Sequence, residues 1–217
     1  MIRFRGWIGI LACVSILVAA PDTWAGAATD QLKGAIDRVV KTLDDPALKG
    51  DSRVADRRVA VRKVANDIFD FGEIARRSLA RHWQPLTEQQ REEFIQLFSD
   101  LLERSYISKI EAYGGEKILF IGERVDGDQA TVATKIITKN GTEVPIDYRQ
   151  LKRGDRWLVY DVSIEGVSLV SNYRTQFNRI IQTASYAELV HKMKTRQGEL
   201  LATDGAPSKQ AAPAKGK

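Results

Sequence analysis

Apolar residues recur every three or four positions in the first half of the chain, which is the spacing of amphipathic helices. The first helix is expected over residues 30–44, with Thr29 as its N-cap. A second helix is expected after Ser52, which is placed to cap it in the same way. Both helices would turn their apolar stripes towards the core.

Two capping-box patterns mark the starts of two further helices. The first pattern is at residues 70–73, and its helix is expected to stop before Pro85. The second is at residues 87–90, and it opens the longest helix, which is expected to run to Tyr113. That helix has the strongest apolar stripe in the chain, and the two glycines after Tyr113 predict its end.

The hydrophobic period changes to two after the long helix, as is typical of β-strands. Asn140-Gly141 is the best hairpin signal, because these residue types readily adopt the positive φ angles of a tight turn. Pro145 lacks a backbone donor and therefore indicates an edge strand or a bulge. The pattern predicts an antiparallel meander of about four strands, at residues 117–125, 131–138, 143–152 and 156–164.

The fourth of these strands has apolar residues at both alternating sets of positions. Strict alternation places Trp157 and Val159 on one face of the sheet. It places a second apolar set on the other face, namely Leu158, Tyr160, Val162 and Ile164. A sheet with two apolar faces is covered by helices on both sides or lines a cavity, and the pattern leaves both alternatives open.

Helical spacing returns after the sheet. One closing helix is marked by apolar positions from Leu169 to Ile181, and a second by positions from Tyr186 to Met193. Helices packed on an antiparallel meander define an α+β fold.

Residues 1–25 have the pattern of a secretory signal peptide. Arg3 and Arg5 form a positive start, and an uncharged apolar run follows that is too short to span a bilayer. Thr23 and Ala25 are small residues at the spacing of a cleavage site, so cleavage is expected after Ala25. The sequence thus predicts export to the periplasm.

Cys13 offers an alternative, because residues 10–13 loosely match the cleavage box of a lipoprotein. The apolar run continues beyond Cys13, whereas polar residues normally follow a lipidated cysteine, so the signal-peptide interpretation is preferred. Cleavage after Ala25 removes the one cysteine of the chain, which excludes thiol chemistry in the exported protein.

Composition excludes several functional classes. A charged fraction of 28% excludes a polytopic membrane protein, and a net charge of +5 nominates no partner by itself. His82 and His191 lack a spaced set of further ligands, so no metal site is predicted. Neither a nucleophile elbow nor a phosphate-binding glycine loop is present in the sequence. The arginines do not interleave with an aromatic platform, which argues against nucleic acid.

An enzymatic alternative rests on Asp147, Tyr148 and Asp161. A curved sheet covered by helices can hold a buried carboxylate and a tyrosine for proton transfer. The simpler interpretation is that these strand-end aspartates pair with Arg149 or Arg174.

The segment 147–149 and the run from Trp157 to Phe177 closely resemble the MlaC family, also called the toluene-tolerance or Tgt-type family. Residues 71–83 and 87–90 fit the same family pattern, and the resemblance covers about residues 30–195. Ala80 departs from the glycine expected before the His-Trp pair, which puts local helix packing in doubt.

The resemblance implies a periplasmic phospholipid carrier without enzymatic activity or a cofactor other than bound lipid. Its expected partners are an outer-membrane lipoprotein complex and the substrate-binding subunit of an inner-membrane lipid ABC transporter, and its expected role is to maintain outer-membrane lipid asymmetry. We expect a monomer. A branch of the family is associated with hopanoids, so hopanoid cargo remains an alternative.

The resemblance also implies a nuclear-transport-factor-like cone with an added helical subdomain. A lipid-binding domain is expected at residues 26–202, with a helical part at about 30–113, a sheet at about 116–164 and closing helices at about 168–201. Residues 203–217 are rich in Ala, Pro and Lys and are expected to form a disordered tail.

A cavity for acyl chains needs large apolar side chains, and an ordinary core needs the same residues. Arg149, Asn172 and Arg174 are candidates for the cavity mouth or for structural hydrogen bonds. The residues predicted to face the lipid tails are Trp83, Phe94, Phe98, Leu101, Leu102, Tyr106, Ile110, Ile136, Ile146, Tyr148, Val162, Ile164, Val167, Leu169, Tyr173 and Phe177.

Overall fold

The computed structural model describes residues 26–195. The predicted signal peptide at residues 1–25, the alternative at Cys13 and the predicted tail at residues 203–217 lie outside the described residues. Within the described part of the chain, no helix combines the length and apolarity needed to cross a membrane.

Every helix predicted from the hydrophobic spacing is present. Two predicted N-caps are wrong, however: Gly26 caps the first helix, while Thr29 lies buried inside it, and Ser52 belongs to a short 3-10 turn before the second helix. The helices are α1 (Ala27–Asp44), α2 (Val54–Ile68), α3 (Phe71–Leu79), α4 (Glu88–Glu111), α5 (Leu169–Thr183) and α6 (Tyr186–Lys194), and the 3-10 turns are η1 (Pro46–Leu48), η2 (Asp51–Arg53) and η3 (Ala80–His82).

The second predicted capping box is confirmed in full. The Thr87 side chain accepts from the Gln90 backbone, and the Gln90 side chain accepts from the Thr87 backbone. At α3 half of the predicted box forms: the Asp70 carboxylate accepts from the Glu73 backbone N–H at 2.9 Å. The Glu73 side chain instead binds arginines.

The four predicted strands form an antiparallel meander, and a short fifth strand follows them. Chain order is also spatial order, and the turn at Asn140-Gly141 joins the second and third strands as predicted. The strands are β1 (Lys117–Asp126), β2 (Gln129–Ile137), β3 (Glu143–Arg153), β4 (Arg156–Ile164) and β5 (Val167–Ser168).

A bulge in β4 overturns the prediction that both faces of this strand are apolar. The pairing slips by one residue, so that Gln150 faces Val159 and Tyr148 faces Val162. Because Gln150 and Tyr148 lie on one face of β3, Val159 and Val162 share a face as well. The extra residue at Tyr160 therefore moves Val162 and Ile164 to the side of Trp157.

β3 is an interior strand and the β2–β3 register has no bulge at Pro145, so the predicted edge holds only locally, on the side facing β4. Pairing between β3 and β4 ends at Ile146 and Ile164. The missing N–H of Pro145 therefore removes no ladder hydrogen bond on the side facing β4. The Pro145 carbonyl still accepts from the Glu165 backbone N–H.

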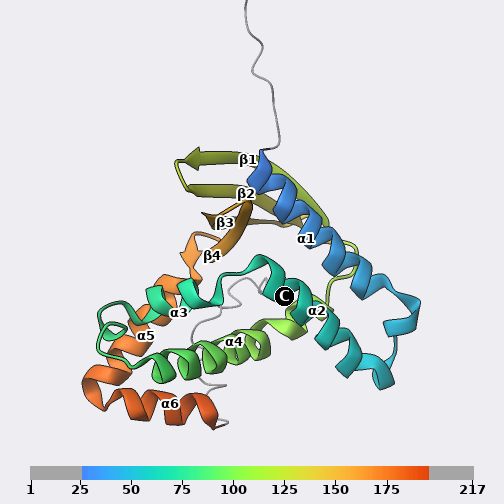
Figure 1. Ribbon diagram of the computed structural model, residues 1–217. Helices are drawn as coiled ribbons and strands as arrows, with labels where there is room; N and C mark the ends of the chain where they lie inside the picture. Colours follow the sequence, from blue (N-terminus) through green and yellow to red (C-terminus); the bar gives the residue numbers. More distant parts are fainter. Residues whose placement is uncertain (1–25, 196–217) are drawn as a thin grey trace, which may run out of the picture.

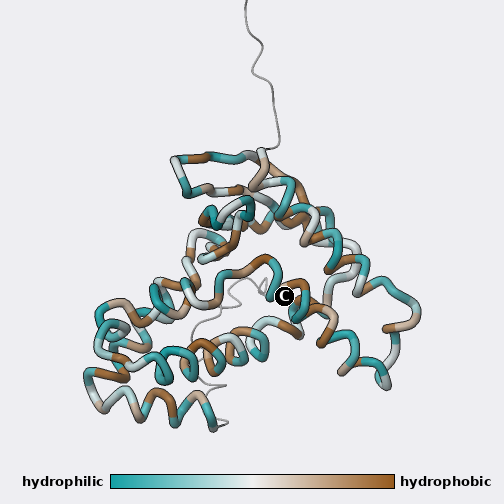
Figure 2. The backbone as a smooth tube through the Cα atoms, in the orientation of Figure 1, coloured by the Kyte–Doolittle hydropathy of each residue, from teal (hydrophilic) through white to brown (hydrophobic). Residues whose placement is uncertain are grey.

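The helices divide between the sheet and a separate group, as Figure 1 shows. Helix α1 lies along the sheet, whereas α4 and α6 lie at the opposite end of the molecule from β1 and β2. Hydrophobic and hydrophilic positions alternate along α4, as an amphipathic helix requires (Figure 2). The predicted α+β class, with an antiparallel sheet covered by helices, is confirmed.

Candidate functional site

Residues paired directly across antiparallel strands share a face, and one face of the sheet is mostly apolar across four strands. Glu123 and Gln150 are polar exceptions on this face. One such row runs from Phe120 through Thr134 and Ile146 to Ile164. We call the following residues the apolar sheet face: Ile118, Phe120, Ala130, Val132, Thr134, Ile136, Val144, Ile146, Tyr148, Val159, Val162 and Ile164.

Helix α1 covers only part of the apolar sheet face. Ala28, Leu32 and Ala35 form a buried cluster with Val132 and Val159. Phe120, Tyr148 and Val162 are half-buried and pack at the edge of this cluster.

Four other members of the apolar sheet face are half-buried: Ile118, Ile136, Val144 and Ile164. Among the described residues, they belong to neither hydrophobic cluster of the protein. Within the described residues, the apolar sheet face therefore has a portion that lies outside both packed clusters.

The second cluster, which we call the helical cluster, is closed and aromatic. It is formed by α3, α4, α5 and α6, and Phe94, Phe98, Tyr173 and Phe177 are its largest fully buried side chains. The Phe98 ring lies 5.0 Å from the centroids of both Tyr173 and Phe177 in edge-on contacts. Such contacts are favoured by the ring quadrupoles, so this cluster is a packed core.

Phe69 joins the two regions. It is partly buried against both clusters, and it forms a parallel bridge with Val159. The backbone N–H of Asp70 donates to the Val159 carbonyl at 2.9 Å. The start of α3 is therefore fixed to β4 beside the apolar sheet face.

Burial shifts the pKa of two tyrosines, one in each of these regions. Burial raises the pKa of Tyr148, on the apolar sheet face, to about 12. Burial also raises the pKa of Tyr106, at the edge of the helical cluster, and the nearby Tyr173 adds to the shift. Both phenols are neutral at physiological pH, so they add no charge to the site.

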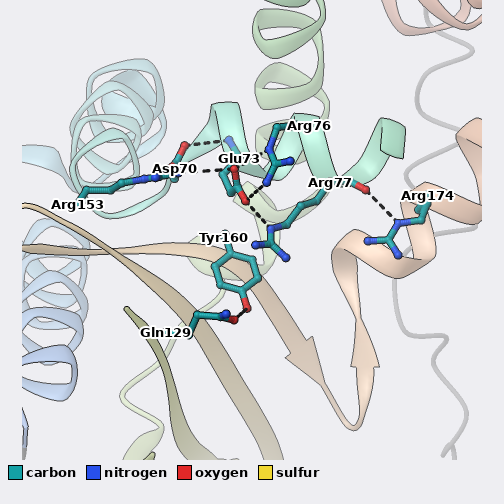
Figure 3. A network of polar contacts seen from close by, with 8 residues as sticks. All are labelled: Asp70, Glu73, Arg76, Arg77, Gln129, Arg153, Tyr160 and Arg174. Atoms are coloured by element: carbon teal, nitrogen blue, oxygen red, sulfur yellow. Dashed lines mark hydrogen bonds and ion pairs between the residues drawn. The ribbon is translucent and has the colours of Figure 1, made fainter. Parts of the chain in front are cut away.

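A network of ion pairs holds α3 to the sheet (Figure 3). The buried Glu73 carboxylate accepts from Arg76 at 2.9 Å and from Arg77 at 2.7 Å, and Arg153 of β3 lies 3.6 Å away. Burial alone would raise the pKa of the Glu73 carboxyl, but the hydrogen bonds from Arg76 and Arg77 outweigh it and hold the pKa below its ordinary value. Glu73 is therefore a charged anchor between α3 and the sheet.

The same arginines reach further into the structure (Figure 3). The guanidinium of Arg77 lies 4.1 Å from the ring centroid of Tyr160, the extra residue of the β4 bulge. Arg174 of α5 donates to the Arg77 carbonyl at 3.0 Å. These contacts tie the bulge to both α3 and α5.

Asp161 has a structural environment. Its buried carboxylate accepts from Ser168 Oγ at 2.6 Å, from the Val170 backbone at 3.0 Å and from Arg149 at 3.2 Å. These bonds fix the start of α5 to β4. The expected pairing of Asp161 with Arg149 is confirmed.

The structure separates the predicted tail-facing residues into two groups. Ile136, Ile146, Tyr148, Val162 and Ile164 come together on the apolar sheet face. Nine more lie within the helical cluster or at its edge, namely Trp83, Phe94, Phe98, Leu101, Leu102, Tyr106, Leu169, Tyr173 and Phe177.

Two predicted residues are exposed. Val167 is 48% exposed, and it pairs with Ile164 across the β4–β5 turn, so it extends the apolar sheet face to its rim. Ile110 is 37% exposed near the end of α4.

The three polar candidates all make contacts within the fold. Arg149 pairs with Asp161 on the face of the sheet opposite the apolar one. Arg174 binds the Arg77 carbonyl, and Asn172 accepts from Gln176 at 3.3 Å.

Phe69, which the helical spacing already directs towards the core, and Phe120 were not predicted as site residues, although each has a sequence signal. Phe69 directly precedes the N-cap Asp70, where a hydrophobic staple residue is common. Phe120 alternates with Ile118 in β1, but a bulge after it breaks the period.

An open groove of about 620 Å³ lies elsewhere, between α1, the end of α2 and β4. Arg38 and Asp67 form an ion pair in its lining, and Arg156 lies beside them. Ala35, Ile68 and Trp157 also line the groove, so it combines charged and apolar side chains, whereas acyl chains are best accommodated by a lining without charges. Among the described residues there is also no cluster of metal-ligating side chains.

Comparison with known proteins adds relatives of stated function. The chain is 25% identical over 139 residues to the intermembrane phospholipid transport system binding protein MlaC of Haemophilus influenzae, a match covering 60% of this chain and 65% of that protein. It is 22% identical over 180 residues to the toluene tolerance protein ttg2D of Pseudomonas putida, covering 82% of each protein.

A solved structure resembles the whole described fold. The phospholipid-binding protein from Ralstonia solanacearum, determined in complex with a phospholipid, superposes with a TM-score of 0.71 at 26% identity and covers 81% of this chain and 98% of that one. The family described as MlaC protein matches residues 33–195. This match spans well over half of the sequence, so the chain belongs to the MlaC family, as its resemblance predicted.

Proposed function

We propose that this protein is a periplasmic phospholipid carrier that holds acyl chains against the apolar sheet face. The observation that carries the proposal is the set of half-buried residues Ile118, Ile136, Val144 and Ile164, which pack against neither hydrophobic cluster. Apolar side chains that lie outside a packed core are typical of a surface that receives an apolar ligand. The phospholipid bound to the Ralstonia solanacearum protein supports this choice of ligand.

The energetics favour a carrier of this kind. A diacyl lipid has on the order of 30 methylenes, and exposing them to water costs roughly 24 kcal/mol at ~0.8 kcal/mol each. A lipid therefore needs an apolar surface to cross an aqueous compartment. The apolar sheet face supplies such a surface, and its neutral Tyr148 hydroxyl imposes no charge on the chains.

The division of the fold suits repeated loading and release. The helical cluster is packed independently of the apolar sheet face, so the fold does not depend on the lipid for its aromatic core. We infer that the protein exchanges lipid between an outer-membrane lipoprotein complex and an inner-membrane ABC transporter, and thereby supports outer-membrane lipid asymmetry. The name of the Haemophilus influenzae relative, an intermembrane phospholipid transport component, supports this role.

The test is to express the full chain for export, purify the protein without detergent and measure bound lipid by native mass spectrometry. We expect close to one phospholipid per protein. A hopanoid in its place would keep the carrier function and change the cargo. Absence of any lipid, together with no gain in thermal stability on adding phospholipid, would contradict the proposal, because a ligand that binds the native state must stabilise it.

Two substitutions in one strand sharpen this test. Val162→Trp adds bulk on the apolar sheet face and is expected to abolish lipid loading. Leu158→Trp is the matched control, because Leu158 is also half-buried in β4 but lies on the opposite face, paired with Leu151. Equal lipid content in the two folded variants would exclude the apolar sheet face as the binding surface.

A further inference from the structure

The start of α1 is joined to β1 by one carboxylate. Oε2 of Glu123 accepts from the Thr29 backbone N–H at 2.7 Å and from the Thr29 hydroxyl at 2.5 Å. The other carboxylate oxygen, Oε1, lies against Gly26, the N-cap of α1. A Cβ built on Gly26 would stand 1.9 Å from Oε1, so any other residue at this position would require the carboxylate to shift.

This position is also the predicted processing site. Cleavage after Ala25 makes Gly26 the first residue, and its backbone nitrogen becomes an α-ammonium group. Since the Cβ position lies 1.9 Å from Oε1, tetrahedral geometry puts the Gly26 nitrogen within about 4.4 Å of the same oxygen. Free rotation of a chain end can close that distance to an ion pair.

We propose that the Glu123 carboxylate is a binding site for the α-ammonium group that cleavage creates at Gly26. The uncleaved chain has a neutral peptide nitrogen there, so the ion pair exists only in the processed protein. Processing therefore completes the contact between α1 and β1, next to the part of the apolar sheet face that α1 covers. This inference is independent of the proposed lipid cargo.

The electrostatic surroundings isolate the pair. The sheet row that begins at Glu123 continues through Val132, Tyr148 and Val162, which carry no charge near neutral pH. Other charged side chains on these elements include Asp30 and Lys33 at the start of α1, Arg124 and Asp126 on β1, Lys135 on β2 and Arg156 on β4.

Most of these charged side chains point away from the Glu123 carboxylate. Alternation places Arg124, Asp126 and Lys135 on the opposite face of the sheet, and Arg156 donates to the Asp67 carbonyl. Asp30 and Lys33 are exposed on α1, and Asp30 is the one further carboxylate in the first turn. Asp30 is therefore the control for a general effect of negative charge.

The pKa of the α-amino group tests the proposal. In protein starting at Gly26, prepared from a fusion cut to leave that residue first, the ¹³Cα shift of Gly26 is followed against pH. A carboxylate partner raises an amine pKa, so we expect a value about one unit above the ordinary 7.7–8.0. Glu123→Gln should return it to the ordinary range, and Asp30→Asn should preserve most of the shift. An ordinary pKa in the unsubstituted protein would overturn the proposal.

Thermal unfolding provides a second test, in which Glu123 is not substituted. The folded pKa of the amine is raised, so its stabilisation is complete below the unfolded value and is lost as pH rises through the folded one. Acetylating Gly26 should therefore lower Tm at pH 7 and leave it unchanged at pH 10. Equal Tm values at pH 7, or an exported protein whose mass shows a first residue other than Gly26, would refute the site.

Discussion

The helical cluster and the apolar sheet face contain similar residue types but have different packing. In the helical cluster, Phe94, Phe98 and Phe177 are fully buried and meet edge to face. On the apolar sheet face, Ile136 and Ile164 are only half-buried and lack a place in either cluster. Apolar composition alone therefore does not distinguish a core from a binding surface, whereas completeness of packing does.

The largest expected effect is in the helical cluster. Phe177→Ala removes a fully buried ring that touches three other aromatic rings, so it should lower the free energy of unfolding by about 4 kcal/mol. Urea unfolding measures the loss. The folded fraction should still bind lipid as before, and a loss of lipid in folded protein would place the cargo in this cluster instead.

The next effect concerns the ion pairs that join the two regions. Glu73→Gln leaves its arginine partners without their carboxylate, and because Arg76 and Arg153 are half-exposed we expect a loss of about 2 kcal/mol. The folded pKa of Glu73 is lowered, so its stabilisation is complete above the ordinary value of 4.5 and is lost as pH falls through the folded value. Unfolding of both proteins between pH 7 and pH 3 should show the difference shrink in acid. A constant difference would contradict the account.

A smaller effect is expected on the apolar sheet face. Ile136→Ala removes a half-buried side chain without opening a cavity in a packed core, which corresponds to about 1.2 kcal/mol. In lipid-free protein, the loss in the free energy of unfolding should be well below that of Phe177→Ala. An equal loss for the two variants would show that Ile136 belongs to a packed core. The two regions would then not differ in packing.

The smallest expected effect is a gain in stability from a substitution at the end of α3. Ala80 has φ 48° and ψ −118°, a conformation that suits glycine. Ala80→Gly relieves this strain but adds flexibility to the unfolded chain, so we expect a net gain of about 0.7 kcal/mol. Unchanged or lower Tm would show that the backbone here is not strained.

Local signals in the sequence predicted most of the fold. The capping box at Thr87 and the turn at Asn140-Gly141 depend on neighbouring residues alone, and both are present. The prediction of Thr29 as an N-cap was wrong because of a contact that is distant in the sequence. The Thr29 hydroxyl donates to Glu123, 94 positions away. Position 80 shows that a departure from a family pattern can mark a backbone constraint, since the expected glycine would fit the positive φ.

The candidate site could be predicted only in part. Its residues in β3 and β4 were predicted individually, but their shared face was not, because the bulge at Tyr160 changes the alternation. That bulge is stabilised by Arg77 from α3, a contact that no local pattern encodes. Which apolar residues remain half-buried depends on how far α1 extends over the sheet, and this too is a property of tertiary packing.

The most direct test of the central claim locates the acyl chains. The purified protein is loaded with a phospholipid that carries a photoactivatable diazirine in one acyl chain, irradiated, digested and mapped by mass spectrometry. We expect adducts on the apolar sheet face, at Ile136, Tyr148 and Ile164. Adducts confined to the helical cluster, or to the groove between α1 and β4, would contradict the central claim.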